Sequence, residues 1–297
     1  MSRDTLRVGL VGAGPWAHKV HAPGIVAHPR TTLVATWARR AEAAADLAMR
    51  HGATPTTDFD ELLRQVDAVA FAVPPAVQAP LAARAALAGK HLILEKPVAA
   101  SVDEAETLVD AVARTGVTSM MMLTFRYAAA TRKWLDDVHT VSDWVGGEAR
   151  WFSGTLLDRK YENSLWRHDG GALADIGPHV FDLLDAALGP VESVEQARFT
   201  APGLWHVMLG HEGGRLSTAT LSMHTPVQPA ITDFAVHGPQ GFRAFDASGE
   251  APERYLVLLD DFTQLVADKT AEHPLDVRRG LHLQRLLGRV TTQLVGG

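Results

Sequence analysis

Residues 6–17 read LRVGLVGAGPWA and decide the fold of the N-terminal part of the chain. An apolar run is followed by the pattern G-x-G-x-x-A, which is typical of the turn from the first strand into the first helix of a dinucleotide-binding unit. Gly12 permits the tight turn, Gly14 lets the backbone approach a pyrophosphate, and Ala17 is small enough for close packing of helix on strand. The N–H groups that open the next helix then face the phosphates. The residues expected to bind phosphate here are Gly12, Ala13, Gly14, Trp16 and Ala17.

Residues 1–124 alternate between short apolar runs and helical patterns. Such alternation predicts parallel strands joined by right-handed crossovers, and apolar runs without polar interruptions indicate helices on both faces of the sheet. We therefore expect an α/β fold with a doubly wound parallel sheet in a domain covering residues 1–124. The expected strands are Leu6–Val11, Thr32–Trp37, a weak strand near Ala53, Ala68–Val73, His91–Leu94 and Thr118–Leu123, and the clearest helices are Ala76–Leu87 and Val102–Arg114.

Residues 125–297 follow a different pattern and are assigned to a second domain. One helix is expected from Tyr127 to about Val138, and a strongly amphipathic helix ends at Leu188. Strand-like segments then follow one another across short turns, which indicates an antiparallel sheet. These strands are expected at Val191–Phe199, Leu204–Leu209, Arg215–His224, Ile231–His237 and Phe242–Phe245, and the closing helices at Tyr255–Val266 and Val277–Val290.

Length, charge and composition narrow the class of protein. A chain of 297 residues suits two domains. A formal net charge of -6 argues against binding to nucleic acid, because neutralising phosphates requires a basic surface. The chain has no cysteine, which excludes disulfides and thiolate chemistry and fits the cytoplasm. The apolar run near the N-terminus is too short for a signal peptide or a membrane span, and no histidine pattern indicates a metal site.

The end of the second expected strand bears on the choice of nicotinamide cofactor. NAD enzymes commonly carry Asp or Glu there, which binds the ribose 2′-hydroxyl. This chain instead reads Thr36-Trp37-Ala38-Arg39-Arg40. Arg39 can pair with a 2′-phosphate and stack on adenine, which favours NADP over NAD. The alternative is that both arginines are solvated residues at the start of the next helix, in which case NAD remains a candidate.

Two further segments resemble a known family. Residues 89–97 read GKHLILEKP and closely resemble the G-K-H-V-x-x-E-K-P signature of the glucose–fructose oxidoreductase and inositol dehydrogenase family, often written Gfo/Idh/MocA. Trp166-Arg167, Gly170-Gly171 and Asp175-Ile176-Gly177-Pro178-His179 resemble the W-R … G-G-x-x-x-D-x-G-x-H motif of the same family. The resemblance extends from the phosphate loop to the final helix.

The resemblance implies an N-terminal Rossmann domain, a C-terminal α/β domain with an open, mostly antiparallel sheet, and an active site between them. Members are mostly oxidoreductases that act on sugars, cyclitols and related compounds. We therefore expect a small polyhydroxylated substrate and a homodimer or homotetramer that pairs through the C-terminal sheet. Gln78 replaces a frequent histidine and Thr124 a common asparagine, and these departures bear on the substrate more than on the chemistry.

Three residues are candidates for the hydride-transfer chemistry. Lys96 follows an expected strand, where it can donate a hydrogen bond to the reacting oxygen and stabilise its developing charge. His179 suits acid–base work near neutral pH, and Asp175 can orient the imidazole or bind a substrate hydroxyl. Glu95 either holds Lys96 or contacts the cofactor. The alternative is that these residues have no catalytic role. Lys96 is then a surface lysine, and Asp175 and His179 form a local contact at a helix end.

The remaining site residues are expected at the ends of the predicted strands and in the second motif. The cofactor-binding set is completed by Arg39, Val73, Pro74, Glu95 and Lys96. The expected substrate-binding residues are Arg126, which is retained from the family pattern, Trp166 and Arg167.

A non-catalytic NAD(P)-binding sensor or regulatory protein is the main alternative, because such members occur in the family. They would be expected to lose the lysine or the histidine, whereas this chain keeps Lys96 and His179. A glycosidase with tightly bound NAD is a third alternative, and it would need metal ligands or additional acid–base groups. The sequence therefore favours an NAD(P)-dependent dehydrogenase or reductase that acts on CH–OH groups.

Overall fold

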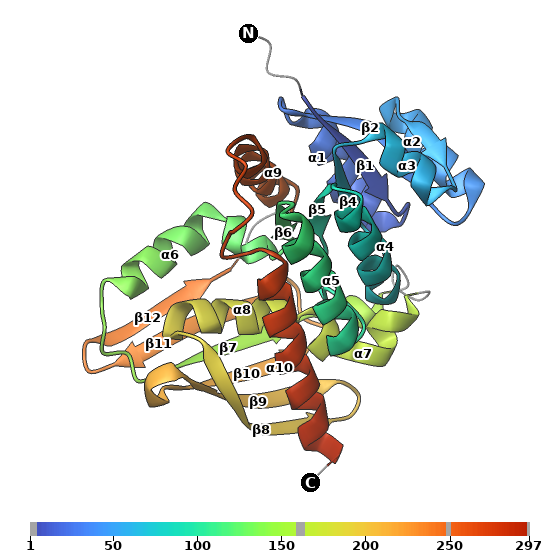
Figure 1. Cartoon of the computed structure of the whole chain (residues 1–297). Helices are drawn as coiled ribbons and strands as arrows, with labels where there is room; N and C mark the ends of the chain where they lie inside the picture. The colour runs from blue at the N-terminus through green and yellow to red at the C-terminus, as the bar shows by residue number, and fades with distance from the viewer. Residues whose placement is uncertain (1–4, 159–163, 248–250, 296–297) are drawn as a thin grey trace. The chain divides into compact units, whose positions relative to one another are not determined.

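The structure is a computed structural model that describes residues 5–158, 164–247 and 251–295 (Figure 1). The chain divides into two compact units. The first unit comprises residues 1–124 and 250–284, and the second comprises residues 125–249 and 285–297.

The first unit is built on six parallel strands in the order β3-β2-β1-β4-β5-β6. This is the strand order of a Rossmann-type fold, and it confirms the predicted doubly wound parallel sheet. The order reverses at β1 and β4, and open sheets of this kind bind ligands there, beyond the carboxyl ends of the strands. The strands are β1 (Leu6–Val11), β2 (Thr31–Trp37), β3 (Thr54–Thr56), β4 (Ala68–Phe71), β5 (His91–Leu94) and β6 (Ser119–Met121).

Helices connect these strands, and local sequence sets their ends. Ser101 caps α5 by accepting a hydrogen bond from the Glu104 backbone N–H (3.2 Å), while the Glu104 carboxylate accepts one from Ala100 N (3.0 Å). The same helix ends at Gly116, which adopts the left-handed conformation that glycine tolerates. The helices are η1 (Ala17–His21), α1 (Ala22–Ala27), α2 (Ala41–His51), α3 (Phe59–Gln65), α4 (Pro75–Leu87), α5 (Val102–Thr115) and α9 (Ala251–Ala267).

Residues 250–284, which the sequence pattern assigned to the second domain, group with the first unit in the structure. Specific hydrogen bonds explain this. Met121 N on the edge strand β6 donates to Leu275 O (2.8 Å), and Val277 N donates to Ser119 Oγ (3.1 Å). The returning segment therefore supplies polar partners to the edge of the first sheet.

The second unit contains a mixed, mostly antiparallel sheet with the order β12-β11-β7-β10-β9-β8. All neighbouring strands pair antiparallel except β7 and β10, which pair parallel. The open, mostly antiparallel sheet predicted for the C-terminal part is thus confirmed. The strands are β7 (Gly146–Phe152), β8 (Val191–Thr200), β9 (Leu204–His211), β10 (Leu216–Ser222), β11 (Ile231–Gly238) and β12 (Gly241–Asp246).

The two faces of this sheet differ in burial. Ala149, Phe234, Ala219 and Val207 lie on one face and are buried. Their neighbours along the strands point the other way, to what we call the outer face. The outer face carries Glu148, Arg150, Thr218, Asp233 and Phe242.

Helices α6 (Ala129–His139), α7 (Leu165–Asp175) and α8 (Gly177–Leu188) belong to the second unit, with the last part of α10 (Val277–Val295). The sequence predicted one helix ending at Leu188, whereas the structure has two that meet at Ile176. Pro178 stands in the first turn of α8, where proline is tolerated because its missing N–H has no helical partner. Across the described residues, every helix is too short or too polar to cross a membrane.

Candidate active site

The phosphate loop leaves β1 in the geometry that its glycines allow. Gly12 has a φ of 113°, and a Cβ placed on it would lie 2.3 Å from Ala72 O, so no other residue fits. Gly12 N donates to Trp37 O at the end of β2 (2.8 Å). Gly14 has open space on its Cβ side, and Ala17 is fully buried at the start of η1. The loop therefore combines a fixed turn with an open approach to its backbone.

A cavity of about 510 Å³ opens beside this loop in the first unit. Arg39 and Arg40 line this cavity and are exposed, whereas Ala38 is buried. Among the described residues that line the cavity, two are arginines and none is an acid. Its glycine lining and positive charge fit the phosphates of a dinucleotide. The lining residues are Gly12, Ala13, Gly14, Trp37, Ala38, Arg39, Arg40, Ala43, Ala72, Val73, Pro74 and Val77.

Glu95 and Lys96 follow β5 at the same edge of the sheet as the phosphate loop, because β1 and β5 run parallel to each other. Glu95 is buried and Lys96 is partly exposed. Trp16 Nε1 donates to Glu95 Oε1 (2.6 Å), which links the loop directly to this segment. The Lys96 backbone N–H lies 3.3 Å from Glu95 Oε2 and donates to it. Trp16, Ala17, Glu95 and Lys96 are not among the residues that line the cavity.

Gln78 on α4 holds the segment that carries Lys96. Its side chain is fully buried, and its Oε1 accepts from Glu95 N (2.8 Å) while its Nε2 donates to Glu95 O (2.7 Å). Nε2 also donates to Val98 O (3.0 Å). The amide thus fixes the backbone on both sides of Lys96. In the sequence, Gln78 stands out only as a departure from a frequent histidine, and this role was not foreseen.

His21 and Tyr255 were also absent from the expected site. His21 Nε2 lies 2.8 Å from Glu95 Oε1, and His21 Nδ1 lies 3.1 Å from the Tyr255 hydroxyl oxygen. His21 and Tyr255 are both completely buried. The spacing between them in the sequence gives no signal of this contact, because Tyr255 comes from the segment that returns to the first unit.

The second unit brings together Trp166, Arg167 and Asp175. Arg167 Nε donates to Asp175 Oδ2 (3.1 Å), and its guanidinium carbon lies 4.4 Å from the centre of the Trp166 ring. Asp175 is the last residue of α7 and is buried. The aspartate that the sequence offers for catalysis is therefore held by the arginine that it offers for substrate binding.

His179 lies in the first turn of α8, so the break at Ile176 separates it from Asp175. The His179 ring is buried and contacts two aromatic rings, with centroid distances of 5.5 Å to Phe125 and 5.8 Å to Trp151. These rings fix the plane of the imidazole by packing.

Arg126 pairs with a different carboxylate from the one that Arg167 holds. Its Nη1 lies 3.3 Å from both carboxylate oxygens of Asp182, which is 1% exposed. The pair connects Arg126, in the short helix η2 (Thr124–Tyr127), to α8, and both paired residues belong to the second unit. Arg126 thus neutralises a buried carboxylate, a structural task that the sequence did not predict.

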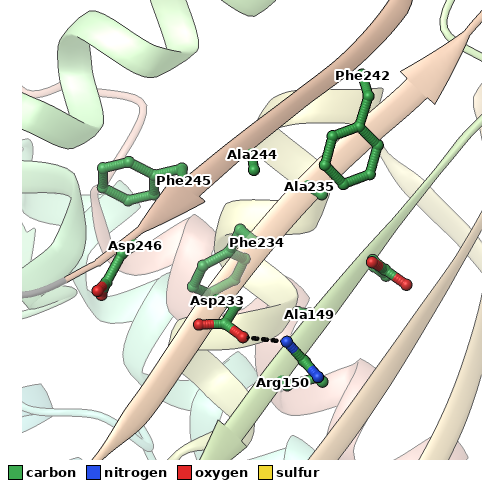
Figure 2. A pocket seen from close by; sticks show the side chains of 10 residues that line it. Ala149, Arg150, Asp233, Phe234, Ala235, Phe242, Ala244, Phe245 and Asp246 are labelled. Atoms are coloured by element: carbon green, nitrogen blue, oxygen red, sulfur yellow. Dashed lines mark hydrogen bonds and ion pairs between the residues drawn. The ribbon is translucent and has the colours of Figure 1, made fainter.

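A second cavity, of about 380 Å³, lies over β7, β11 and β12 (Figure 2). Arg150 and Asp233 point toward one another there and form an ion pair at 2.5 Å. No residue predicted for the active site lines this cavity, within the part of the chain that the structure describes. Over the same part, no group of three or more His, Cys, Asp or Glu side chains is arranged to hold a metal ion.

Comparisons with known proteins agree with this geometry. Residues 6–123 match the model of an oxidoreductase family with an NAD-binding Rossmann fold, and residues 140–242 match the model of the GFO/IDH/MocA C-terminal domain. The dTDP-3,4-didehydro-2,6-dideoxy-alpha-D-glucose 3-reductase of Streptomyces violaceoruber is 32% identical over 190 residues, which are 62% of this chain and 55% of that protein. The chain spans 55 to 67% of the length of the first curated relatives that it matches.

Solved structures share the fold over nearly the whole chain. GenD2 from gentamicin A biosynthesis, in complex with NAD, has a TM-score of 0.86 at 22% identity and covers 99% of this chain and 95% of that one. A levoglucosan dehydrogenase in complex with NADH and L-sorbose has a TM-score of 0.87 at 20% identity, with coverage of 98% and 97%. With both of its domains matched by the family models, the chain belongs to the Gfo/Idh/MocA family of NAD-binding oxidoreductases.

Proposed function

We propose that the protein transfers a hydride between NADP and a carbinol or ketone carbon of a sugar, cyclitol or sugar derivative. The observation that carries this proposal is the hydrogen bond between Trp16 and Glu95, at 2.6 Å. It joins the nucleotide-binding loop to the segment with Lys96, so a charged donor would lie close to a cofactor bound on the loop. The reductase and dehydrogenase names of the relatives support the substrate class.

The preference for NADP rests on the side chains beside the cavity. Arg39 and Arg40 are exposed at its side, and Ala38 occupies a position at the end of β2 where NAD enzymes commonly carry an acid. A guanidinium is suited to a 2′-phosphate because it offers several donors in one plane. NAD is the alternative cofactor.

The proposed chemistry divides the work among three side chains. The cofactor, when bound, would supply a hydride as NADPH or accept one as NADP⁺. Lys96 donates a hydrogen bond from Nζ to the reacting oxygen and stabilises the charge that develops on it. His179 takes the hydroxyl proton during oxidation or returns it during reduction. Asp175, held by Arg167, binds a substrate hydroxyl or orients the imidazole.

The experiment that tests this function measures nicotinamide absorbance with the purified protein. NADPH is offered with keto-sugars, free and nucleotide-linked, and NADP⁺ is offered with sugars and cyclitols. We expect turnover on at least one member of the panel. Tight binding of NADPH without turnover on any of them would instead support the regulatory alternative, which the presence of Lys96 and His179 argues against.

A further inference from the structure

Both oxygens of the Glu95 carboxylate are engaged within the first unit. Trp16 Nε1 and His21 Nε2 approach Oε1 at 2.6 and 2.8 Å, and the Lys96 backbone N–H lies 3.3 Å from Oε2. The Glu95 side chain is only 11% exposed. A buried carboxylate with several donors keeps one orientation, because each donor is lost if the group rotates. Glu95 is therefore fixed between the phosphate loop and Lys96.

The hydrogen-bond directions follow from the inventory of donors. An ionised Glu95 only accepts, so His21 donates to it from Nε2. In the neutral ring, Nδ1 then accepts from the Tyr255 hydroxyl, which lies 3.1 Å away. Burial raises the pKa of Tyr255 well above its ordinary value, and the charge of Glu95 raises it further. The phenol therefore stays protonated and can donate this hydrogen bond. The resulting Tyr255–His21–Glu95 chain runs from α9 to the end of β5.

Packing holds the Tyr255 end of this chain in place. The Tyr255 ring is fully buried and lies against the backbone of Gly24 on α1, where a Cβ would come within 2.4 Å of Cδ1. The His21 and Tyr255 ring centres are 4.7 Å apart. Both rings therefore lack room to turn away from Glu95.

The energetic cost of this arrangement points to a role in the reaction. Apolar side chains of the same volume would fill the space without the desolvation of a carboxylate, an imidazole and a phenol. What the polar chain adds is a fixed orientation for Glu95, and through Glu95 for the Lys96 backbone. A donor that must meet a reacting oxygen depends on such fixation, since small displacements reduce rates strongly.

We propose that Tyr255 and His21 are positioning residues, which act through Glu95 to hold the Lys96 segment in its working position against the phosphate loop. This rests on the proposed function of Lys96 in hydride transfer. Tyr255 is not among the residues that line the nucleotide cavity, and it reaches Glu95 through His21. Its effect on the reaction is therefore expected to be on turnover rather than on cofactor binding.

The test compares Tyr255→Phe with Thr263→Val, which removes a buried hydroxyl from the same helix. The Thr263 hydroxyl donates to Leu259 O (2.7 Å) and has no part in the chain to Glu95. We expect Tyr255→Phe to lower kcat about tenfold while the dissociation constant of NADPH changes less than about twofold. Thr263→Val should leave both values unchanged. An unaltered kcat in Tyr255→Phe would overturn the proposal.

A double-mutant cycle tests whether the effect passes through Glu95. In the Glu95→Gln background, Tyr255→Phe should cause little further loss of kcat, because the carboxylate it serves is gone. Equal loss in both backgrounds would mean that Tyr255 acts by another route. If Tyr255→Phe does not fold, His21→Gln and His21→Leu replace it. Glutamine keeps a donor toward Glu95 and should retain more turnover than leucine, and equal loss would contradict the proposal.

Hydrogen–deuterium exchange separates this proposal from the proposed function. In Tyr255→Phe, and not in Thr263→Val, the Glu95 and Lys96 amides should exchange faster than in the wild type, whether or not a substrate is found. If the wild type turns over none of the substrates, the proposed function is wrong. If exchange at these amides is unchanged in Tyr255→Phe, the proposed positioning role of Tyr255 is wrong, even if the enzyme is active.

Discussion

Arg39 and Lys96 are accessible to solvent, whereas Glu95 and Gln78 are buried and bonded through their polar atoms. An exposed side chain can be exchanged with little effect on its neighbours, while a buried and bonded one carries the structure around it. Substitutions of Arg39 and Lys96, the residues proposed for cofactor choice and for chemistry, should therefore leave the fold intact. Two predictions belong to this scale.

The first concerns the choice of cofactor. Arg39→Ala should weaken binding of NADP about tenfold or more and leave binding of NAD unchanged, because it removes a charge-assisted bond to the 2′-phosphate worth about 1.5–3 kcal/mol. Titration with the reduced forms, NADPH and NADH, whose nicotinamide fluoresces, measures both affinities. Arg114→Ala, an exposed arginine at the end of α5, is the control. Equal weakening of both cofactors would show that Arg39 does not read the phosphate.

The second concerns the proposed proton and charge chemistry. Lys96→Met keeps much of the aliphatic stem and removes the charged donor. Turnover should fall by about 10²–10³, the loss of about 3–4 kcal/mol of transition-state stabilisation, with cofactor affinity retained. Steady-state kinetics on a verified substrate measures this, with Lys133→Met on α6 as the control. Near-normal turnover in Lys96→Met would show that Lys96 is not the donor that stabilises the reacting oxygen.

Sequence motifs predicted residues whose expected role depends on their own local geometry, and they missed residues whose contacts depend on a distant partner. The glycines of the phosphate loop were predicted from local turn geometry, and the structure puts Gly12 and Gly14 beside the cavity. Gln78 and Tyr255 were not predicted, because their partners are set by tertiary contacts that no local pattern encodes.

Among the elements, strands with continuous or alternating apolar residues were predicted well, and β7 was missed. Its sequence begins with Gly146-Gly147 and places Glu148 and Arg150 on the outer face, so neither its composition nor its few apolar positions resemble a strand. Gly147 is required there, since a Cβ would lie 2.8 Å from Ala235 O on β11. The close approach of two backbones thus explains why β7 contains glycine at this position, and this approach is a tertiary contact that the local sequence does not encode.

The antiparallel pair β9 and β10 contains a buried histidine that should make stability depend on pH. Burial lowers the pKa of His211 below its ordinary value of 6.5, while its ring nitrogens contact Gly189 O (2.8 Å) and Ser217 Oγ (2.7 Å). As pH falls, the unfolded chain takes up this proton first. The stabilising contribution is therefore present above about pH 6.5 and is lost as pH falls below it.

Urea unfolding at pH values from about 7.5 to 5 measures this contribution. The unfolding free energy of the wild type should fall with pH, and His211→Gln should reduce the slope. His139→Gln, at an exposed position at the end of α6, should leave the slope as it is. An identical slope in wild type and His211→Gln would contradict the assignment.

At the scale of the whole molecule, we propose that the protein forms a homodimer or homotetramer through the outer face of the second sheet. Phe242 on the edge strand β12 is 55% exposed and lines the cavity of Figure 2 together with Ala235 and Ala244. An exposed apolar area of this kind on an open sheet is typical of an interaction surface. The ion pair of Arg150 and Asp233 beside it supplies polar contacts.

Phe242→Asp should therefore shift the protein toward monomer, because it places a charge in the contact. Leu87→Asp, at an equally exposed apolar position on α4 in the first unit, should not. Sedimentation at micromolar concentration distinguishes the species. A wild type that sediments as a monomer would rule out the assembly, and an unaffected oligomer in Phe242→Asp would place the contact elsewhere.

The return of residues 250–284 to the first unit has a consequence for synthesis on the ribosome. The phosphate loop leaves the ribosome before Tyr255 and the partners of β6, which follow only after residues 125–249 have been made. Until then Gly24 lacks the ring that covers it, and the edge of the sheet lacks its polar partners. Contacts so distant along the chain form late and slowly. The nucleotide-binding unit is therefore completed only after the second sheet has left the ribosome.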